Sequence, residues 1–211
     1  MTRPRTQHAK RAVVIGGSAG GFQALSVLLS LLPADFPAPI LVVQHLHSSD
    51  GGALAEHLGR LAKLKVVEPC DKERITPGRV YVAPANYHML VEREGDISLS
   101  TEERVNWSRP SIDVLLQSAA RAWGEDLIAI ILSGANSDGA QGLEAVKAAG
   151  GLTIAQNPAE ASYGIMPQAA IDTGSVELVM GAAEMARCLQ DLVIGGQDGP
   201  APPSPSEEAA L

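Results

Sequence analysis

Short aliphatic runs, each followed by a stretch of helical periodicity, open this chain and recur along it. Residues 12–16 form the first run, bounded by glycine, and the leucines of residues 20–32 then recur at helical spacing. Residues 39–44 and 52–63 repeat this pair. A strand, a helix and a second strand in this order favour parallel pairing through a right-handed crossover. The pattern therefore predicts an α/β fold: an open, mostly parallel, doubly wound sheet with helices on both faces.

The middle of the chain departs from this alternation. Four short strand candidates, separated by Pro and Gly turns, predict a small antiparallel hairpin excursion at the edge of the sheet; they are residues 65–67, 80–83, 88–91 and 97–99. Ser108, Arg109 and Pro110 then predict the start of a helix, with Ser108 as its N-cap and the proline in its first turn.

The second half returns to the first pattern. Residues 127–132 (LIAIIL) are the most hydrophobic strand candidate and are expected at the centre of the sheet. Further helices and strands are expected at residues 142–149, 152–155, 167–172, 176–180 and 182–192. The sequence thus predicts one domain over residues 11–194, with residues 1–10 as a flexible arm and residues 195–211, rich in Gly, Pro, Ser and Glu, as a disordered tail.

Charge and cysteine usage exclude several classes of protein. The formal net charge of −8 argues against a nucleic-acid binder, because nothing offsets repulsion from the phosphates. No apolar run approaches the roughly 18 residues of a membrane span, so membrane insertion is not expected. Cys70 and Cys188 lie far apart and outside any CxxC pair, which favours reduced thiols. We expect a cytoplasmic protein.

The turn after the first strand holds the candidate nucleophile. Gly16-Gly17-Ser18-Ala19-Gly20 matches the pattern G-x-S-x-G, which places a serine on a tight turn between a strand and a helix. Small flanking residues leave the hydroxyl exposed there. Two other interpretations stay open on this segment alone. It is compatible with a phosphate-binding loop, although neither G-x-G-x-x-G nor a P-loop ending is present, or with a plain glycine-rich turn.

A serine nucleophile needs a base within hydrogen-bond reach, and His45 ends the second predicted strand. Asp138 follows the predicted strand at residues 127–132, at the same edge of a parallel sheet, where it would orient the imidazole. The alternatives are a purely structural histidine, a metal site formed with His47, and an aspartate that only caps the next helix. No H-E-x-x-H motif or carboxylate cluster supports a metal.

Six segments, in order, resemble the catalytic domain of the CheB protein-glutamate methylesterases over residues 11–192. They are IGGSAGG, VVQH, VYVAPANYHM, RPSIDVLLQSAA, IILSGANSDGAQGLEAVKAAGGLTIAQN and IMPQAAI. The resemblance implies a catalytic triad of Ser18, His45 and Asp138 and no cofactor. It also implies hydrolysis of glutamate methyl esters on the helices of methyl-accepting chemoreceptors, together with deamidation of receptor glutamines.

The resemblance also implies which residues line the active site and at which of them this chain differs from the family. Ala19 and Gly20, or Ala135 and Asn136, are the candidate oxyanion or substrate-lining residues. The family often has threonine where Ala19 stands and methionine where Ala135 stands, so rate or substrate preference is expected to differ. Arg109 is either a substrate-facing residue or a structural contact at a helix start.

About ten residues precede the first predicted strand, so the phosphorylatable receiver domain usual in the family is not expected. Three alternatives then stay open: constitutive activity, a separate regulator that replaces the receiver domain, or a role in a chemosensory system other than motility. Two other functions remain as alternatives: a non-catalytic chemosensory binding scaffold, and a small-molecule carboxylesterase that uses the same triad.

Overall fold

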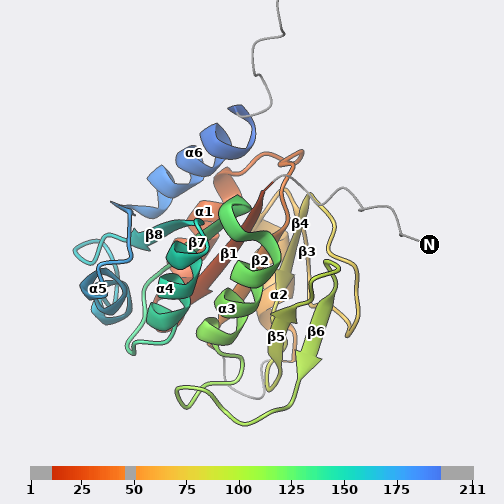
Figure 1. Cartoon of the computed structure of the whole chain (residues 1–211). Helices are drawn as coiled ribbons and strands as arrows, with labels where there is room; N and C mark the ends of the chain where they lie inside the picture. The colour runs from red at the N-terminus through yellow and green to blue at the C-terminus, as the bar shows by residue number, and fades with distance from the viewer. Residues whose placement is uncertain (1–10, 46–50, 196–211) are drawn as a thin grey trace, which may run out of the picture.

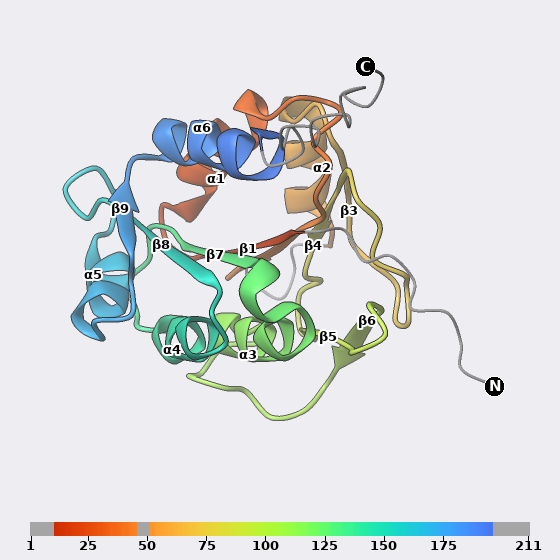
Figure 2. The same ribbon diagram turned by 45° about the horizontal axis from the view of Figure 1, so that its top comes forward.

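The computed structural model describes residues 11–45 and 51–195, so the expected arm and nearly all of the expected tail lie outside the described residues. Within them, a seven-stranded parallel sheet lies between two layers of helices (Figures 1 and 2), which confirms the predicted fold class. The strands run in the order β3-β4-β2-β1-β7-β8-β9. Their bounds are β1 (Ala12–Gly17), β2 (Ile40–Gln44), β3 (Lys65–Val67), β4 (Arg79–Val82), β7 (Leu127–Ile131), β8 (Leu152–Gln156) and β9 (Leu178–Met180).

The two faces of the sheet are covered by different helices, as Figure 2 shows edge-on. One face carries α1 (Gly21–Leu31), α2 (Ala53–Leu61) and α6 (Ala182–Val193). The other face carries α3 (Ile112–Trp123), α4 (Ala140–Ala148), α5 (Ile165–Asp172) and a hairpin of β5 (His88–Val91) and β6 (Ile97–Ser100). None of the described helices has the length and hydropathy that crossing a bilayer requires.

Strand β1 is buried on both faces because its side chains alternate between the two cores. Val13 and Ile15 pack with α1 and α6, whereas Ala12 and Val14 pack with α3 and α4. This strand, and not the one at residues 127–132, is the middle strand of the sheet, so the expected central place of β7 is wrong by one position. Both strands are fully buried, and burial alone does not rank them.

The order of the strands creates the edge at which a site can form. The chain first builds outward from β1 through β2, then returns and places β7 on the other side of β1. Gly17 is level with Gln44 on one side, and Gly16 is level with Ile131 on the other. The carboxyl ends of three neighbouring strands therefore meet at a topological switch point, where α/β sheets bind ligands.

The predicted antiparallel excursion is only half correct. β5 and β6 do pair antiparallel, as a separate two-stranded sheet, but β3 and β4 are parallel strands of the main sheet. The crossover between β3 and β4 contains no described helix, which is why its sequence gave no sign of parallel pairing. Instead, it pairs with the hairpin: Lys72 N–H donates to Ile97 O at 2.8 Å, and Ile97 N–H donates to Glu73 O at 2.8 Å.

Helix α3 begins at Ile112, so the predicted helix start at Ser108 is wrong. Val105 and Ser108 instead close a tight turn through two backbone hydrogen bonds. Asn106 and Trp107, at the tip of this turn, both have left-handed φ values, 51° and 63°. The Arg109–Pro110 peptide is cis, and Ser111 is the residue that precedes the helix. The turn brings the side chain of Asn106 back toward the start of α3.

Candidate active site

Ser18 follows β1 directly, on a turn whose backbone is fixed by its neighbours. The Ser18 N–H donates to Ser133 O at 2.9 Å, and Gly21 N–H donates to Ser18 O at 2.8 Å. Gly20 has φ +72°, and a Cβ there would lie 2.5 Å from the Cβ of Ser162. Glycine is therefore required at position 20 for both conformation and space. The turn leaves Ser18 partly exposed just before the amino-terminal end of α1.

His45 follows β2, the strand beside β1, and contacts both other members of the predicted triad. Its Nδ1 lies 3.2 Å from Oγ of Ser18, and its Nε2 lies 2.8 Å from Oδ2 of Asp138. The neighbouring Gln44 donates from Nε2 to Ser18 O at 2.6 Å and so joins the two strand ends. The His45 side chain is 14% exposed and that of Asp138 is fully buried. The three predicted side chains thus form one hydrogen-bonded chain.

Asp138 accepts hydrogen bonds from five donors. His45 Nε2–H and Ile112 N–H donate to Oδ2; Ser111 Oγ–H, Asp113 N–H and Asn106 Nδ2–H donate to Oδ1. Burial alone would raise the pKa of this carboxyl. The hydrogen bonds from His45 and from the backbone of Ile112 outweigh burial, and they hold the pKa below its ordinary value. Asp138 is therefore built to stay ionised.

The backbone donors of Asp138 belong to the first turn of α3. The alternative interpretation of Asp138 was a cap on the helix that follows it, which is α4. Asp138 instead caps α3, through the N–H groups of Ile112 and Asp113. The start of a helix stabilises a negative charge through its unpaired N–H groups and its dipole. The Asp138 carboxylate thus caps the start of α3 and also accepts a hydrogen bond from the His45 imidazole.

The residues expected to line the site lie close to Ser18 or His45, with one exception. Ala19 and Gly20 continue the serine turn, Ala135 is exposed in the loop after β7, and Asn136 Nδ2 lies 3.4 Å from His45 Nδ1. Gly134 N–H already donates to Tyr163 O at 3.0 Å. Among the described residues, the N–H groups of Ala19, Gly20, Ala135 and Asn136 have no hydrogen-bond acceptor, which leaves all four available to a ligand.

Arg109 is the exception. Its Nη1 donates to the carbonyl oxygens of Thr101 at 2.6 Å and Glu102 at 2.8 Å. These contacts tie down the segment between β6 and α3. They favour the structural interpretation of Arg109 over a substrate-facing role.

Sequence reasoning missed three residues at the site: Asn106, Ser111 and Asp113. All three contact Asp138 or the helix start beside it. A serine and an aspartate at the start of a helix are a recognisable capping signal. Nothing in the sequence indicates that the side chain that caps this helix is Asp138, which lies 25 residues beyond Asp113.

The other histidines do not join the triad within the described part of the chain. His88 is buried, accepts from Ser111 N–H through Nδ1 at 3.2 Å and contacts Glu103 O through Nε2 at 3.0 Å. His57 packs edge-on against Phe22. His47, the proposed metal partner of His45, lies outside the described residues. Among the residues described, no three His, Cys, Asp or Glu side chains form a group that could hold a metal ion.

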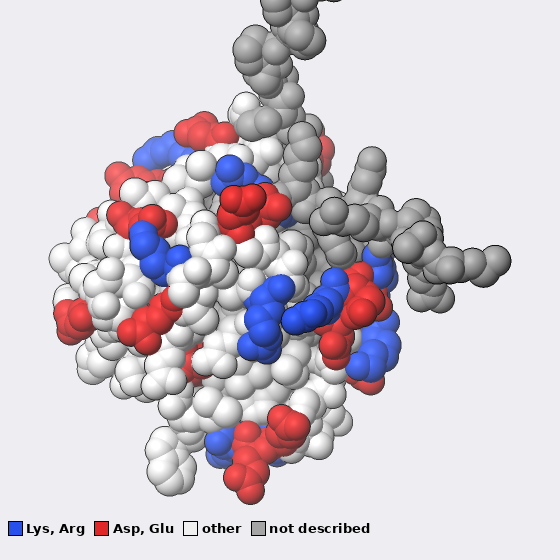
Figure 3. Space-filling view, in the orientation of Figure 1, with Lys and Arg blue, Asp and Glu red and all other residues white. Residues whose placement is uncertain are grey.

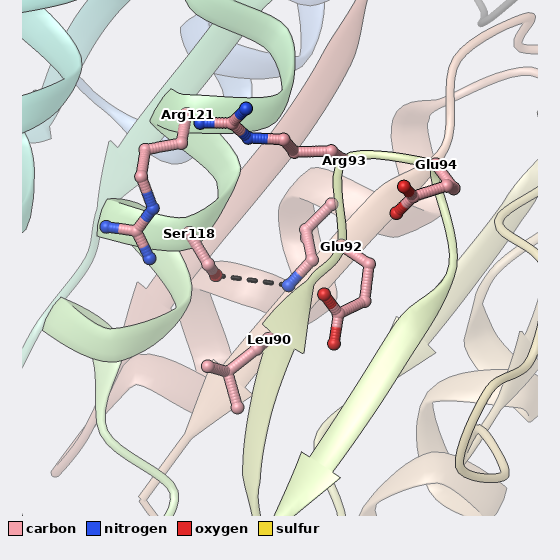
Figure 4. Close-up of a pocket in the computed structure, with 7 residues that line it drawn as sticks. Leu90, Glu92, Arg93, Glu94, Ser118 and Arg121 are labelled. Atoms are coloured by element: carbon pink, nitrogen blue, oxygen red, sulfur yellow. Dashed lines mark hydrogen bonds between the residues drawn. The ribbon is translucent and has the colours of Figure 1, made fainter.

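A cavity of about 360 Å³ lies elsewhere, between the hairpin and α3 (Figure 4). Its lining includes the exposed Arg93 and Arg121 and the buried Ser118. The Ser118 hydroxyl accepts from Val91 N–H at 3.1 Å and donates to Leu115 O at 2.9 Å. No triad residue lines this cavity, so it is separate from the candidate active site.

Comparisons with known proteins identify the family and the fold of this chain. A family model described as CheB methylesterase matches residues 13–189. A putative protein-glutamate methylesterase/protein-glutamine glutaminase of Leptospira interrogans is 46% identical over 175 residues, which are 83% of this chain and 91% of that protein. A protein-glutamate methylesterase/protein-glutamine glutaminase of Archaeoglobus fulgidus is 41% identical over 82% of this chain but only 51% of its own length. The crystal structure of the Thermotoga maritima CheB methylesterase catalytic domain superposes with a TM-score of 0.85 at 34% identity, covering 89% of this chain and all of that one.

Proposed function

The chain belongs to the CheB methylesterase family, and on that premise we propose that it hydrolyses glutamate methyl esters of chemoreceptor proteins through Ser18, His45 and Asp138. The observation that carries the proposal is the continuous chain of contacts from Ser18 Oγ to His45 Nδ1 and from His45 Nε2 to Asp138 Oδ2. A hydroxyl, an imidazole and a buried carboxylate in this order form the arrangement that activates a serine for acyl transfer.

The first half of the reaction forms an acyl-enzyme. Nδ1 of His45 takes the proton from Ser18 Oγ as the oxygen attacks the ester carbonyl carbon. The imidazolium that forms keeps its Nε2–H on Asp138, whose negative charge stabilises it. Collapse of the tetrahedral intermediate breaks the bond to the methoxy group, which leaves as methanol with the proton from Nδ1.

The second half returns the serine. Water gives a proton to His45 Nδ1 as it attacks the acyl carbon, and the bond to Ser18 Oγ then breaks. The glutamate carboxylate leaves, and the hydroxyl of Ser18 is protonated again. The same steps with a glutamine side chain release ammonia in place of methanol, which is why one site can support both the esterase and the glutaminase activity in the relatives' names.

We propose that the N–H groups of Ala19 and Ala135 stabilise the oxyanion of the intermediate. Ala19 follows the nucleophile at the start of α1, and Ala135 lies in the loop that leads to Asp138. Their N–H groups make no hydrogen bond with a described residue. Donors that are aimed in advance at a developing negative charge are worth about 2.7–4 kcal/mol each in such sites.

The surroundings of Ser18 suit a protein substrate. Ser18 is half-buried at the carboxyl ends of the parallel strands, and Trp107 is 93% exposed on the turn that carries Asn106. Tyr163 and Ile165 are also exposed, next to the loop that holds Gly134. Figure 3 shows acidic and basic side chains interspersed over this face of the molecule, including a group at the bottom of the view below α3. Tryptophan and tyrosine are enriched among the side chains that dominate binding energy at protein interfaces, so Trp107 and Tyr163 are candidate contacts for a protein substrate.

We also propose that a separate protein regulates the enzyme. The alignment with the Archaeoglobus fulgidus relative covers 51% of that protein, so the match takes in the candidate triad and leaves the rest of that relative unmatched. Titrating phosphorylated response-regulator proteins from the same cell into the esterase assay tests this. A rise in kcat with one of them supports separate control, and an unchanged kcat with all of them contradicts it.

Methanol release from a methylated chemoreceptor fragment tests the main proposal. The wild-type chain is expected to release methanol, Ser18→Ala to release none, and Ser30→Ala to match the wild type, because Ser30 bonds only within α1. Equal release by wild type and Ser18→Ala would end the proposal. Receptor binding without methanol release would favour a scaffold, and faster turnover of short esters than of the receptor fragment would favour a small-molecule esterase.

A further inference from the structure

The first turn of α3 and the first turn of α4 are each capped by an aspartate that lies at the start of the other helix. Asp138, just before α4, accepts from Ile112 N–H and Asp113 N–H at the start of α3. Asp113, in the first turn of α3, accepts through Oδ1 from Gly139 N–H at 2.9 Å and Gly142 N–H at 2.6 Å at the start of α4. The two caps are reciprocal, so neither helix start can shift without moving the other carboxylate.

One amide group joins the two carboxylates. Nδ2 of Asn106 donates to Asp113 Oδ2 at 2.7 Å and to Asp138 Oδ1 at 3.2 Å. Asn106 has φ +51°, a left-handed conformation that asparagine tolerates better than most residues. The amide supplies hydrogen-bond donors between two buried negative groups that would otherwise repel each other.

We infer that Asp113 and Asn106 are positioning residues of the triad, which hold the Asp138 carboxylate in the orientation that directs Oδ2 at His45; the inference rests on the proposed function. Asp113 fixes the backbone immediately after Asp138 through Gly139 N–H. Asn106 occupies Oδ1 of Asp138, together with Ser111 Oγ–H. With Oδ1 occupied in this way, Oδ2 is the oxygen that faces His45 Nε2.

The Asp113 carboxyl accepts all three of its described hydrogen bonds, so they match its ionised form. Burial nevertheless raises the pKa of Asp113 to about 6; the hydrogen bond from Gly142 N–H opposes the rise and the charge of Asp138 adds to it. The chain therefore keeps a buried carboxylate beside Asp138 although burial favours its neutral form. Simple helix capping does not need this, because a neutral serine or asparagine caps as well.

Asp113→Asn separates positioning from capping. The carbonyl oxygen of the new amide can still accept from Gly139 and Gly142, so the start of α4 keeps its cap. Its NH2 group, however, then faces the NH2 group of Asn106. If Asn106 turns its amide over to resolve this, its oxygen faces Asp138 Oδ1 and repels it. We expect kcat for methanol release to fall roughly 10- to 100-fold, with KM within about twofold of the wild type.

Two variants at position 106 give an independent test. Asn106→Gly removes the amide and keeps the left-handed backbone, and kcat is expected to fall about 10-fold. Asn106→Asp keeps the shape but places a third carboxylate between Asp113 and Asp138, so its kcat is expected to be lower than that of Asn106→Gly. A residue that only shaped the turn would give the opposite order, because aspartate is the closer mimic of asparagine.

Controls separate these effects from loss of folding. Asp71→Asn removes a carboxylate that accepts from Leu99 N–H at the hairpin, and it should leave kcat unchanged. Leu58→Ala creates a cavity in α2 on the opposite face of the sheet. It should lower the free energy of unfolding without changing kcat. If Asp113→Asn and Asn106→Gly lower the free energy of unfolding but keep the wild-type kcat, as Leu58→Ala is expected to, the inference is wrong.

A spectroscopic readout keeps this inference distinct from the proposed function. The Nε2–H proton shared by His45 and Asp138 is expected as a downfield proton resonance in the wild type, absent from His45→Ala. Asp113→Asn and Asn106→Gly should shift or broaden it, and Asp71→Asn should not. An unchanged resonance in both variants overturns the inference. A wild type that releases no methanol, with the resonance still sensitive to Asp113→Asn, would overturn the proposed function alone.

Discussion

Nε2 of His45 lies 2.8 Å from Oδ2 of Asp138. The pKa of Asp138 is held low by the hydrogen bonds from His45 and Ile112, against the effect of burial, so the carboxylate can only accept. The imidazole proton therefore belongs on Nε2, which leaves the lone pair of Nδ1 toward Ser18 Oγ at 3.2 Å. This is the reverse of the chymotrypsin-type triad, in which Nε2 faces the serine and Nδ1 faces the aspartate.

The ring orientation predicts the Nε2–H tautomer for neutral His45. Nitrogen-15 NMR of imidazole-labelled protein distinguishes a protonated from an unprotonated ring nitrogen. We expect the proton on Nε2 at a pH where His45 is neutral, and we expect Asp138→Asn to weaken this preference. A spectrum with the proton on Nδ1 would contradict the orientation described here.

Asp138→Asn is expected to lower kcat by about 10⁴-fold, as loss of the orienting carboxylate does in other triads. The reason is specific to this site: an amide cannot accept all five hydrogen bonds that Asp138 receives, and its NH2 group would meet another donor. Steady-state kinetics on the methylated receptor fragment measure the change. A loss of less than about 10-fold would mean that Asp138 has only its capping role.

The buried Asp113 carboxyl predicts a stability difference that depends on pH. Its pKa in the folded state is about 6, raised by burial from an ordinary value of 3.8. A raised pKa means that the folded state favours the protonated form. The stabilisation is complete below about pH 4 and is lost as pH rises through 6, by up to about 3 kcal/mol.

Asp113→Asn cannot titrate, so it removes this dependence. The free energy of unfolding of the wild type relative to Asp113→Asn should fall between pH 4 and pH 7, as measured by urea denaturation at each pH. Only this trend, and not the absolute difference, depends on the pKa, because the substitution also changes hydrogen bonds. A constant difference across this range would contradict a raised pKa for Asp113.

Gly139 is expected to be the least replaceable glycine at the start of α4. It has φ +97°, and a Cβ there would lie 2.5 Å from Ile131 Cδ1 and 2.8 Å from Ile112 Cγ2. Gly139→Ala should therefore cost about 1–3 kcal/mol of stability from overpacking beyond the backbone strain, and should lower kcat because Asp138 is the preceding residue.

Gly174→Ala is the matched control for this substitution, because Gly174 has φ +73° and nothing lies within 4 Å of the added Cβ. It carries the conformational strain without the clash. Thermal denaturation compares the two variants. Equal losses in Gly139→Ala and Gly174→Ala would show that the contacts with Ile131 and Ile112 are not a constraint.

The sequence was sufficient to predict the general fold and to place the candidate site residues at the ends of three strands. Aliphatic runs before Ser18, His45 and the loop of Asp138 predicted three buried parallel strands with a common edge, and the three side chains do meet there. The pairing of β3 and β4 within the main sheet was not predictable, because their crossover has no helical pattern. Its backbone pairs instead with a hairpin about 20 residues further along the chain.

The hydrogen-bond partners of Asp138 could not be predicted from the sequence either. Four of its five donors come from one short segment, whose position depends on how α3 packs against α4; they are Asn106, Ser111, Ile112 and Asp113. Ser108 and Pro110 gave a reasonable helix-start signal, but the chain uses that stretch for a turn that brings Asn106 back to the carboxylates. Capping signals identify a helix start without identifying which side chain occupies it.

Labelling with a serine-directed fluorophosphonate, followed by peptide mapping, tests most directly whether Ser18 is activated by His45. We predict one adduct, on Ser18, absent from Ser18→Ala and formed at least about 100-fold more slowly in His45→Ala. An adduct on another serine, or labelling at equal rates in wild type and His45→Ala, would contradict the catalytic role assigned to this triad.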